Sequence, residues 1–254
     1  MARRSVKPQQ NPQVVRWHVK ADAVEAIAAA EDYIAIAARN AIAQRNAFRM
    51  VLAGGETPRR LYERLASTDS DWADWHIYFG DERCVAAQDA QRNSVMAERA
   101  WLASSAIPRS QVHPIPAELG PDAAAAAYSR ELEPAGEFDL VLLGLGEDGH
   151  TASLFPGRGW GTLAQDPAVL AVRNAPKPPP DRVSLSAWRL SFTHSVVVLV
   201  TGESKQDAVR RWSAGENLPI RSIAPSRGVE VFAERAATST LRSALELPPK
   251  ATGG

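Results

Sequence analysis

The amino-acid sequence predicts an α/β fold with three layers, in which a mostly parallel, Rossmann-like sheet has helices on both faces. Two observations predict this fold. Apolar strand-like runs alternate with helix-like segments along the chain, and the run SVVVLVTG at 195–202 is almost entirely apolar. Alternation is typical of parallel sheets, and an apolar strand is typical of burial on both faces. A chain of 254 residues with 45% hydrophobic content can bury a substantial core.

We expect one α/β domain over residues 16–247, with room for a small second lobe. The N-terminal residues, 1–15, are predicted to form a disordered leader, because their basic residues are not followed by the apolar segment of a signal peptide. The C-terminal residues PPKATGG, at 248–254, are predicted to be a disordered tail.

Periodicity and turn residues predict the first elements in order. Apolar positions recur with helical spacing over 21–47, which indicates an amphipathic helix. RMVLA at 49–53 is a strand candidate, and the following helix at 58–65 begins with proline and takes Thr57 as its N-cap. WHIYFG at 75–80 has the composition of a second strand.

The remaining elements continue the alternation. Two helices and three strands are expected next, at 90–103, 122–132, 138–143, 169–172 and 182–186. A proline-rich loop over 174–180 separates the last two of these strands. After the apolar strand, a helix is expected to end near Trp212, and VEVFAE at 229–234 forms the final strand before a closing helix.

Charge and composition exclude several classes of function. Lys plus Arg and Asp plus Glu both number 29, so no overall field attracts nucleic acid or an anionic membrane. No segment has the apolar length of a transmembrane helix. The single cysteine, Cys84, excludes an internal disulfide and fits a reducing cytoplasm, where we expect the protein to act as a monomer or weak homodimer.

Polar or glycine-rich sequences follow four of the predicted strands. They lie at Gly54–Thr57, Asp81–Arg83, Gly144–His150 and Gly202–Lys205. In open α/β sheets, ligands bind outside the carboxyl ends of the strands. The sequence therefore predicts that residues far apart in the chain meet at one edge of the sheet.

One of these segments contains the dinucleotide-binding pattern G-x-G-x-x-G, formed by Gly144, Gly146 and Gly149. That pattern requires a long helix directly after it, but Pro156 and several glycines interrupt the chain there. The expected acidic residue would be Asp166, which precedes the next apolar run instead of following it. We therefore do not expect a nicotinamide or flavin cofactor.

Several positions could form an anion site, although each has an ordinary structural alternative. Gly54, Gly55 and Thr57 place backbone N–H groups at a helix start, which can bind an anion or simply form a tight turn. Lys205 could meet a phosphate or remain solvated. Arg182 follows the proline-rich loop, which suits a phosphate clamp but also an ordinary surface arginine.

Acid–base chemistry is expected chiefly at His150. Imidazole titrates near neutral pH, and the nearby carboxylate of Asp148 could orient or charge-stabilise it. The segment Asp81–Arg83 could supply two carboxylates for acid–base chemistry or form a salt-bridged strand end. A nucleophilic role is not expected for Cys84, because the sequence has no cysteine–histidine signature. The five histidines show no metal-ligand spacing, so no metal site is predicted.

Taken together, these motifs resemble the 6-phosphogluconolactonases of the pentose phosphate pathway. The matching blocks are AGGETPRRLYERL (53–65), DERCVAAQDAQRN (81–93), FDLVLLGLGEDGHTASLFPG (138–157), NAPKPPPDRVSLS (174–186) and VTGESKQDAV (200–209). The resemblance implies hydrolysis of 6-phospho-D-glucono-1,5-lactone without metal or organic cofactor. It also implies His150 as general base, substrate binding by Arg83 near the Gly54–Gly55 turn, and phosphate binding by Arg182 and Lys205. Asp81 is grouped with these substrate-binding residues.

The mechanism that follows needs an activated water and a stabilised oxyanion, and Gly146 and Gly149 are the candidate oxyanion donors. The chain departs from the family pattern at Ala53, Ala86 and Arg92, where serine, proline and serine are usual. Two alternatives remain. One is a deaminase of amino sugar phosphates, but those enzymes carry a glutamate where this chain has Phe155. The other is a sugar-phosphate sensor, which needs a DNA-binding module for which the residues before the first helix leave no room.

Overall fold

The computed structural model describes residues 13–241. The predicted tail at 248–254 and most of the predicted leader lie outside the described residues. The end of the leader was placed too late, because Val15 begins a strand and Gln13 Nε2 donates to the carbonyl oxygens of Ile220 and Ile223 at 2.7 and 2.6 Å.

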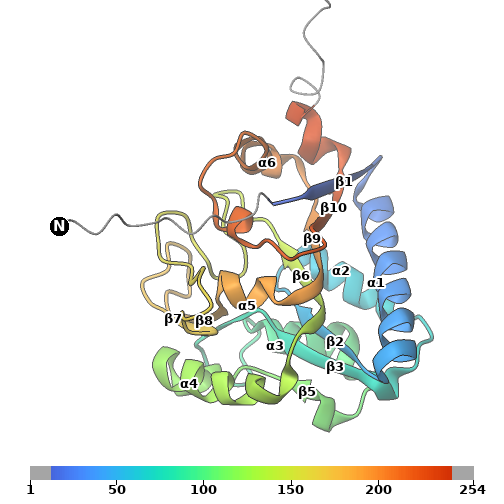
Figure 1. Ribbon diagram of the computed structural model, residues 1–254, viewed down its shortest axis with the longest axis vertical. Helices are drawn as coiled ribbons and strands as arrows, with labels where there is room; N and C mark the ends of the chain where they lie inside the picture. The colour runs from blue at the N-terminus through green and yellow to red at the C-terminus, as the bar shows by residue number, and fades with distance from the viewer. Residues whose placement is uncertain (1–12, 242–254) are drawn as a thin grey trace, which may run out of the picture.

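A seven-stranded parallel sheet forms the centre of the molecule, in the order β1-β10-β9-β6-β2-β3-β5 (Figure 1). Every strand pair in it is parallel, which confirms the predicted fold class. Its strands are β1 (Val15–Lys20), β2 (Phe48–Leu52), β3 (Trp75–Phe79), β5 (Val112–His113), β6 (Phe138–Gly144), β9 (Thr193–Val200) and β10 (Val229–Glu234).

A second, three-stranded sheet has the order β4-β8-β7 and is antiparallel. It consists of β4 (Asp81–Arg83), β7 (Val169–Val172) and β8 (Arg182–Leu185). The sequence predicted the last two as strands but did not separate them from the main sheet. The proline-rich loop explains the difference, because parallel pairing needs a crossover connection whereas a returning loop pairs two strands antiparallel.

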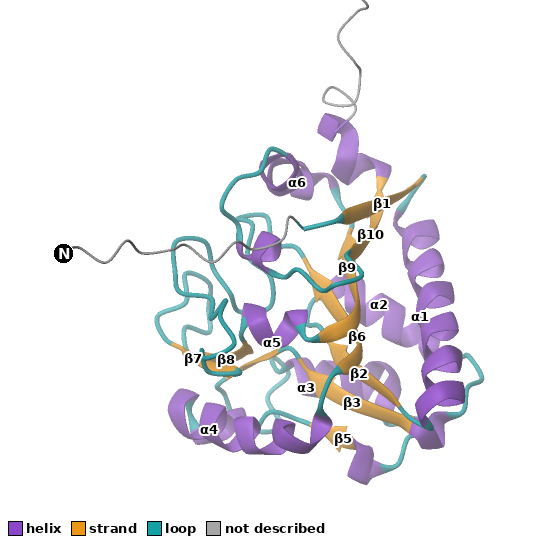
Figure 2. Cartoon of the chain, viewed as in Figure 1, coloured by secondary structure: helices purple, strands orange, loops and turns teal. Residues whose placement is uncertain are grey.

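Helices cover the main sheet (Figure 2). They are α1 (Ala23–Arg45), α2 (Glu56–Leu65), α3 (Asn93–Ala97), α4 (Pro121–Leu132), α5 (Ala187–Ser191) and α6 (Gln206–Ser213). One π-helical turn, Glu98–Leu102, continues α3 within the single helix predicted there. Short 3₁₀ helices lie at Trp72–Asp74, Arg109–Gln111, Ala117–Leu119, Glu133–Ala135, Glu203–Lys205, Pro219–Ser222 and Arg235–Leu241. In the described chain, no helix is both long and apolar enough to cross a bilayer.

The start of α2 differs from the prediction. Gly55, not Thr57, is the N-cap, and its φ of 106° is a backbone conformation that glycine adopts readily. The helix therefore begins at Glu56, before the proline. The Thr57 hydroxyl lies 2.6 Å from the Thr201 hydroxyl, so it links α2 to the end of β9 instead of capping the helix.

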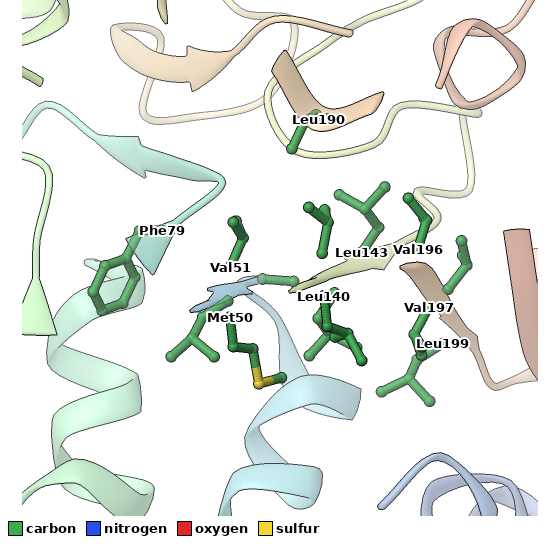
Figure 3. Packing of buried hydrophobic residues seen from close by; sticks show 14 of the residues in the cluster. Met50, Val51, Phe79, Leu140, Leu143, Leu190, Val196, Val197 and Leu199 are labelled. Carbon is green, nitrogen blue, oxygen red and sulfur yellow. The ribbon is translucent and has the colours of Figure 1, made fainter. Parts of the chain in front are cut away.

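The neighbouring strands β6 and β9, near the middle of the main sheet, are almost completely buried. From Ser195 to Val200 every residue of β9 is buried, as the apolar sequence predicted. Figure 3 shows Leu190 of α5 on one side of the strands and Met50 pointing to the other side, where helices lie. Burial on both faces holds the central strands rigidly, so the loops at their ends have a fixed base.

Replacing Leu140 by alanine is expected to lower the free energy of unfolding by about 2–5 kcal/mol, because the side chain is fully buried in β6 and its removal leaves a cavity. The matched control is Val19→Ala at the sheet edge, which is 44% exposed and should change stability by less than about 0.5 kcal/mol. Urea unfolding measures both variants. Equal losses would contradict a core centred on β6.

Candidate active site

The four polar segments predicted at strand ends come together in the structure. They follow β9, β6, β2 and β3, which are consecutive neighbours in the main sheet. A cavity of about 260 Å³ lies at this edge, and every segment contributes to its lining. Of the predicted site residues, those that line it are Gly54, Gly55, Asp81, Arg83, Gly146, His150, Arg182 and Lys205.

The titratable centre of the cavity is the pair formed by His150 and Asp148. The ring Nδ1 is hydrogen-bonded to Asp148 Oδ1, and the His150 backbone N–H donates to the same oxygen at 3.3 Å. Since an ionised carboxylate only accepts, Nδ1 carries the proton and the neutral ring has Nε2 available as a base.

Burial sets the protonation state of this pair. It lowers the pKa of His150 below its ordinary value, against the opposing hydrogen bond and charge of Asp148. For Asp148 itself, burial raises the pKa, but the hydrogen bond and charge of His150 outweigh it and leave the pKa low. The pair therefore consists of a carboxylate and a neutral imidazole near neutral pH.

Gly146 and Phe155 shape the position of the His150 ring. A Cβ at Gly146 would lie 2.0 Å from His150 Nδ1, so only glycine leaves room for the ring. The Phe155 ring, which is buried, packs against the imidazole with 5.0 Å between centroids. The imidazole is held by packing as well as by its hydrogen bond.

The two glycines predicted as oxyanion donors are occupied by the turn itself. The N–H of Gly146 donates to the carbonyl oxygen of His150 at 2.7 Å, and that of Gly149 donates to the carbonyl oxygen of Gly146 at 2.9 Å. These bonds close the tight turn that presents His150. In this conformation neither N–H can donate to an oxyanion, which corrects that prediction.

The start of α2 has free N–H groups next to Gly55, which lines the cavity. The backbone N–H groups of Glu56 and Thr57 have no hydrogen-bond partner among residues 13–241. Gly54 brings the backbone close to Asn93, whose Oδ1 would lie 2.0 Å from a Cβ at that position. Unpaired N–H groups and the positive end of the helix dipole suit an anion.

Arg182 and Arg83 lie directly opposite each other in the antiparallel pair of β8 and β4. Like charges across a strand pair are unfavourable unless an anion offsets them. Arg182 is only 4% exposed, and burial lowers its pKa despite the nearby charge of Asp81. In the described chain, the buried Nε of Arg83 has no hydrogen-bond partner.

The carboxylates of Asp81 and Glu82 have different surroundings. Asp81 lines the cavity and accepts from Asn93 Nδ2 at 3.0 Å and from the Ser153 hydroxyl at 2.5 Å. Glu82 is completely buried and accepts from the backbone N–H groups of Asn93 and Ser94 at 2.7 and 2.8 Å. Glu82 therefore caps α3, and only Asp81 faces the cavity.

Lys177 and Asn93 are among the polar cavity residues that were not predicted. Both lie inside sequence blocks that carry the family resemblance, and a lysine set among prolines was the available signal. Lys205 was predicted and lines the cavity; burial lowers its pKa, while Glu147 acts in the opposite direction. Thr57 and Asp148 do not line the cavity themselves.

Nucleophilic cysteine chemistry is not supported here. Burial, with a further contribution from Asp181, raises the pKa of the Cys84 thiol to about 11, so little thiolate exists near neutral pH. Among residues 13–241, no group of three or more His, Cys, Asp or Glu side chains is placed to hold a metal ion.

The family described as glucosamine-6-phosphate isomerases/6-phosphogluconolactonase matches residues 21–232 of the chain. The chain is 38% identical to a 6-phosphogluconolactonase of Synechocystis sp., covering 80% of this chain and 88% of that protein. It is also 38% identical to one of Mycobacterium leprae, with 82% and 88% covered.

Solved structures agree with this similarity. The fold matches 6-phosphogluconolactonase from Thermotoga maritima with a TM-score of 0.80 and 26% identity, covering 87% of this chain and all of that one. It matches the enzyme from Trypanosoma brucei with a TM-score of 0.76 and 28% identity, covering 90% and 99%. A monomeric glucosamine-6-phosphate deaminase, 18% identical with a TM-score of 0.75, shares the fold over 89% of this chain and all of its own.

Replacing Gly146 by alanine is expected to push the His150 ring off Asp148 and to lower the free energy of unfolding by about 1–3 kcal/mol, because the added methyl overlaps Nδ1. Gly159→Ala is the control, since a Cβ there meets nothing within 4 Å. Urea unfolding and the imidazole ¹H–¹⁵N signals of both variants test this. An unchanged His150 signal in Gly146→Ala would show that the ring is not held where we describe it.

Proposed function

We propose that this chain, which belongs to the family of glucosamine-6-phosphate isomerases and 6-phosphogluconolactonases, is a carboxylic ester hydrolase that opens 6-phospho-D-glucono-1,5-lactone to 6-phospho-D-gluconate in the oxidative pentose phosphate pathway. The observation that carries the proposal is the neutral His150, held by Asp148 beside a cavity rich in cations. Relatives 38% identical over most of their length are named for this activity.

The chemistry needs one base, which His150 supplies. Its Nε2 takes a proton from water as the water oxygen bonds to C1 of the lactone. When the C1–O bond of the ring breaks, the ring oxygen leaves and receives that proton from the imidazolium. The products are a hydroxyl group and a carboxylic acid, which ionises. Asp148 stays ionised and stabilises the imidazolium between these two proton transfers.

The phosphate of the substrate would lie remote from this reaction and fix the ring in place. The groups available to it are the N-terminal N–H groups of α2, the ammonium of Lys205 and the guanidinium of Arg83. Arg182 adds positive charge opposite Arg83, although its Nε and Nη2 already donate to backbone carbonyl oxygens. Binding energy from the phosphate is thereby used to position C1 near His150. The proposed chemistry requires no metal or organic cofactor.

The alternative within the family is a deaminase or isomerase acting on an amino sugar phosphate. The resemblance places a glutamate of those enzymes where this chain has Phe155. That side chain is buried, packs on His150 and lies 5.6 Å from the Arg182 guanidinium. An apolar ring cannot shuttle protons during ring opening, which favours hydrolysis. A cytoplasmic location and a monomeric or weakly dimeric state stay predictions.

Replacing His150 by asparagine is expected to lower kcat on 6-phosphogluconolactone by about 10²–10⁴-fold, because the general base is lost while the side chain remains polar. In the wild type, kcat/KM should start to fall only below about pH 6.5, the usual pKa of histidine, because burial lowers the pKa of His150. A continuous assay on freshly generated lactone, corrected for spontaneous opening, measures both.

A wild-type chain that opens the lactone no faster than buffer would refute the proposed function. A loss of less than about tenfold in His150→Asn would leave the activity standing but remove His150 from the role of base. Circular dichroism and melting of the variant control for misfolding, since both should match the wild type.

Replacing Lys205 by methionine should lower kcat/KM for the phosphorylated lactone by about 10–100-fold, because a charge-assisted contact is worth roughly 1.5–3 kcal/mol. Unphosphorylated gluconolactone should be affected far less. Arg210→Met, an exposed residue on α6, removes the same charge outside the cavity and controls for the change in net charge. Equal losses on both substrates in a folded protein would show that Lys205 does not bind the phosphate.

A further inference from the structure

The proline-rich segment Pro176–Pro180 carries one charged residue, Lys177, to which the mechanism above gives no role. Its side chain lines the same cavity as His150 and is 42% exposed. Lys177 therefore has both access to a ligand and a position beside the reacting groups.

Arg182 holds this segment in place. Its Nε donates to the carbonyl oxygen of Pro179 at 2.9 Å, and its Nη2 donates to those of Lys177 and Pro178 at 3.1 and 3.0 Å. Since Arg182 is almost fully buried, these bonds anchor the loop to the body of the protein. The anchor includes the backbone of Lys177 itself, so its side chain starts from a fixed point.

The ammonium of Lys177 lies beside the Asp148–His150 pair. Its Nζ is 3.6 Å from Asp148 Oδ1, the oxygen that holds the His150 ring. At this distance the two groups form an ion pair but no hydrogen bond. In the part of the chain that the structure describes, Nζ donates no hydrogen bond. An ammonium carries three donors, and these remain available to a ligand.

The proposed reaction needs a hydrogen-bond donor for the oxyanion at this end of the cavity. Attack of water on C1 places a negative charge on the carbonyl oxygen, which must be stabilised in the transition state. The N–H groups of Gly146 and Gly149 are used inside the turn and cannot do this. The ammonium of Lys177, which extends from an anchored backbone to the Asp148–His150 pair, can.

We propose that the Lys177 ammonium is the catalytic group that stabilises the oxyanion formed on the lactone carbonyl, an inference that rests on the proposed lactonase function. Lys177 stays protonated throughout and forms no covalent bond. Its ammonium pairs with Asp148 before the reaction and donates to the carbonyl oxygen as charge develops there. When the ring C1–O bond breaks, the electron pair on the oxyanion re-forms the carbonyl double bond, and the charge passes to the departing ring oxygen, which the His150 imidazolium protonates.

The test compares Lys177→Met with Lys177→Arg on 6-phosphogluconolactone and on unphosphorylated gluconolactone. Loss of one oxyanion donor costs about 10²–10³-fold in kcat, so Lys177→Met should lose that much on both lactones with little change in KM. Lys177→Arg, which keeps the charge, should recover part of the loss. Spontaneous opening is subtracted in every case.

The pH dependence of kcat/KM provides a second measurement, because loss of a purely structural side chain would not move its acidic limb to higher pH. The charged groups that act on His150 are Asp148 in its own loop, Lys177 and Asp81 from β4. Lys177 lowers the pKa of His150, so its removal should move the acidic limb of kcat/KM to higher pH. The same rise should be visible in the His150 imidazole titration by NMR, without substrate.

Three outcomes would overturn the inference. A loss confined to KM for the phosphorylated lactone would make Lys177 a phosphate ligand, as expected for Lys205. An unchanged kcat would remove Lys177 from the reaction. A loss on both lactones that Lys177→Arg does not relieve, with altered melting, would show a structural role. If the wild-type chain has no lactonase activity, the proposed function itself is refuted. If the wild-type chain is active, the variants test the role of Lys177 alone.

Discussion

The parallel pairing of β6 between β9 and β2 is the constraint on which the rest of the structure depends. It places the carboxyl ends of neighbouring strands in one row, so the loops after them must share one edge. Because these strands are buried on both faces, the row cannot shift without opening the core. The His150 turn, the start of α2 and the Lys205 segment owe their proximity to this pairing, since no disulfide or metal links them in the described chain.

Two buried carboxylates outside the cavity have close partners in the fold. Asp139 at the opposite end of β6 is paired with Arg45 and accepts from the Arg49 backbone N–H at 2.7 Å. Glu82 caps α3 in full burial. Each of these carboxylates has partners that offset the cost of removing it from water. The cavity differs, because its lining has four cationic side chains against two carboxylates, and that excess of positive charge distinguishes a binding site from a structural ion pair.

The sequence predicts most of the fold and the site because strong signals coincide there. Apolar strands followed by glycine and charge identify the carboxyl-end loops directly. The β1 strand was missed although Val15, Trp17 and Val19 alternate with polar residues as in a strand, because the segment follows directly on the predicted leader; it pairs with β10. The oxyanion glycines were predicted wrongly, since composition indicates where N–H groups lie but not which carbonyl oxygens already accept from them.

The pairing of Arg83 with Arg182 couples ligand occupancy to folding. Folding brings two like charges to facing positions on β4 and β8, which is unfavourable, and an anion that binds both would offset this repulsion. By mass action, any small dianion that fits will raise the unfolding temperature with its concentration. An anion bound between these arginines would therefore favour the folded chain over the unfolded one, and local opening at β4 and β8 would become rarer as its concentration rises.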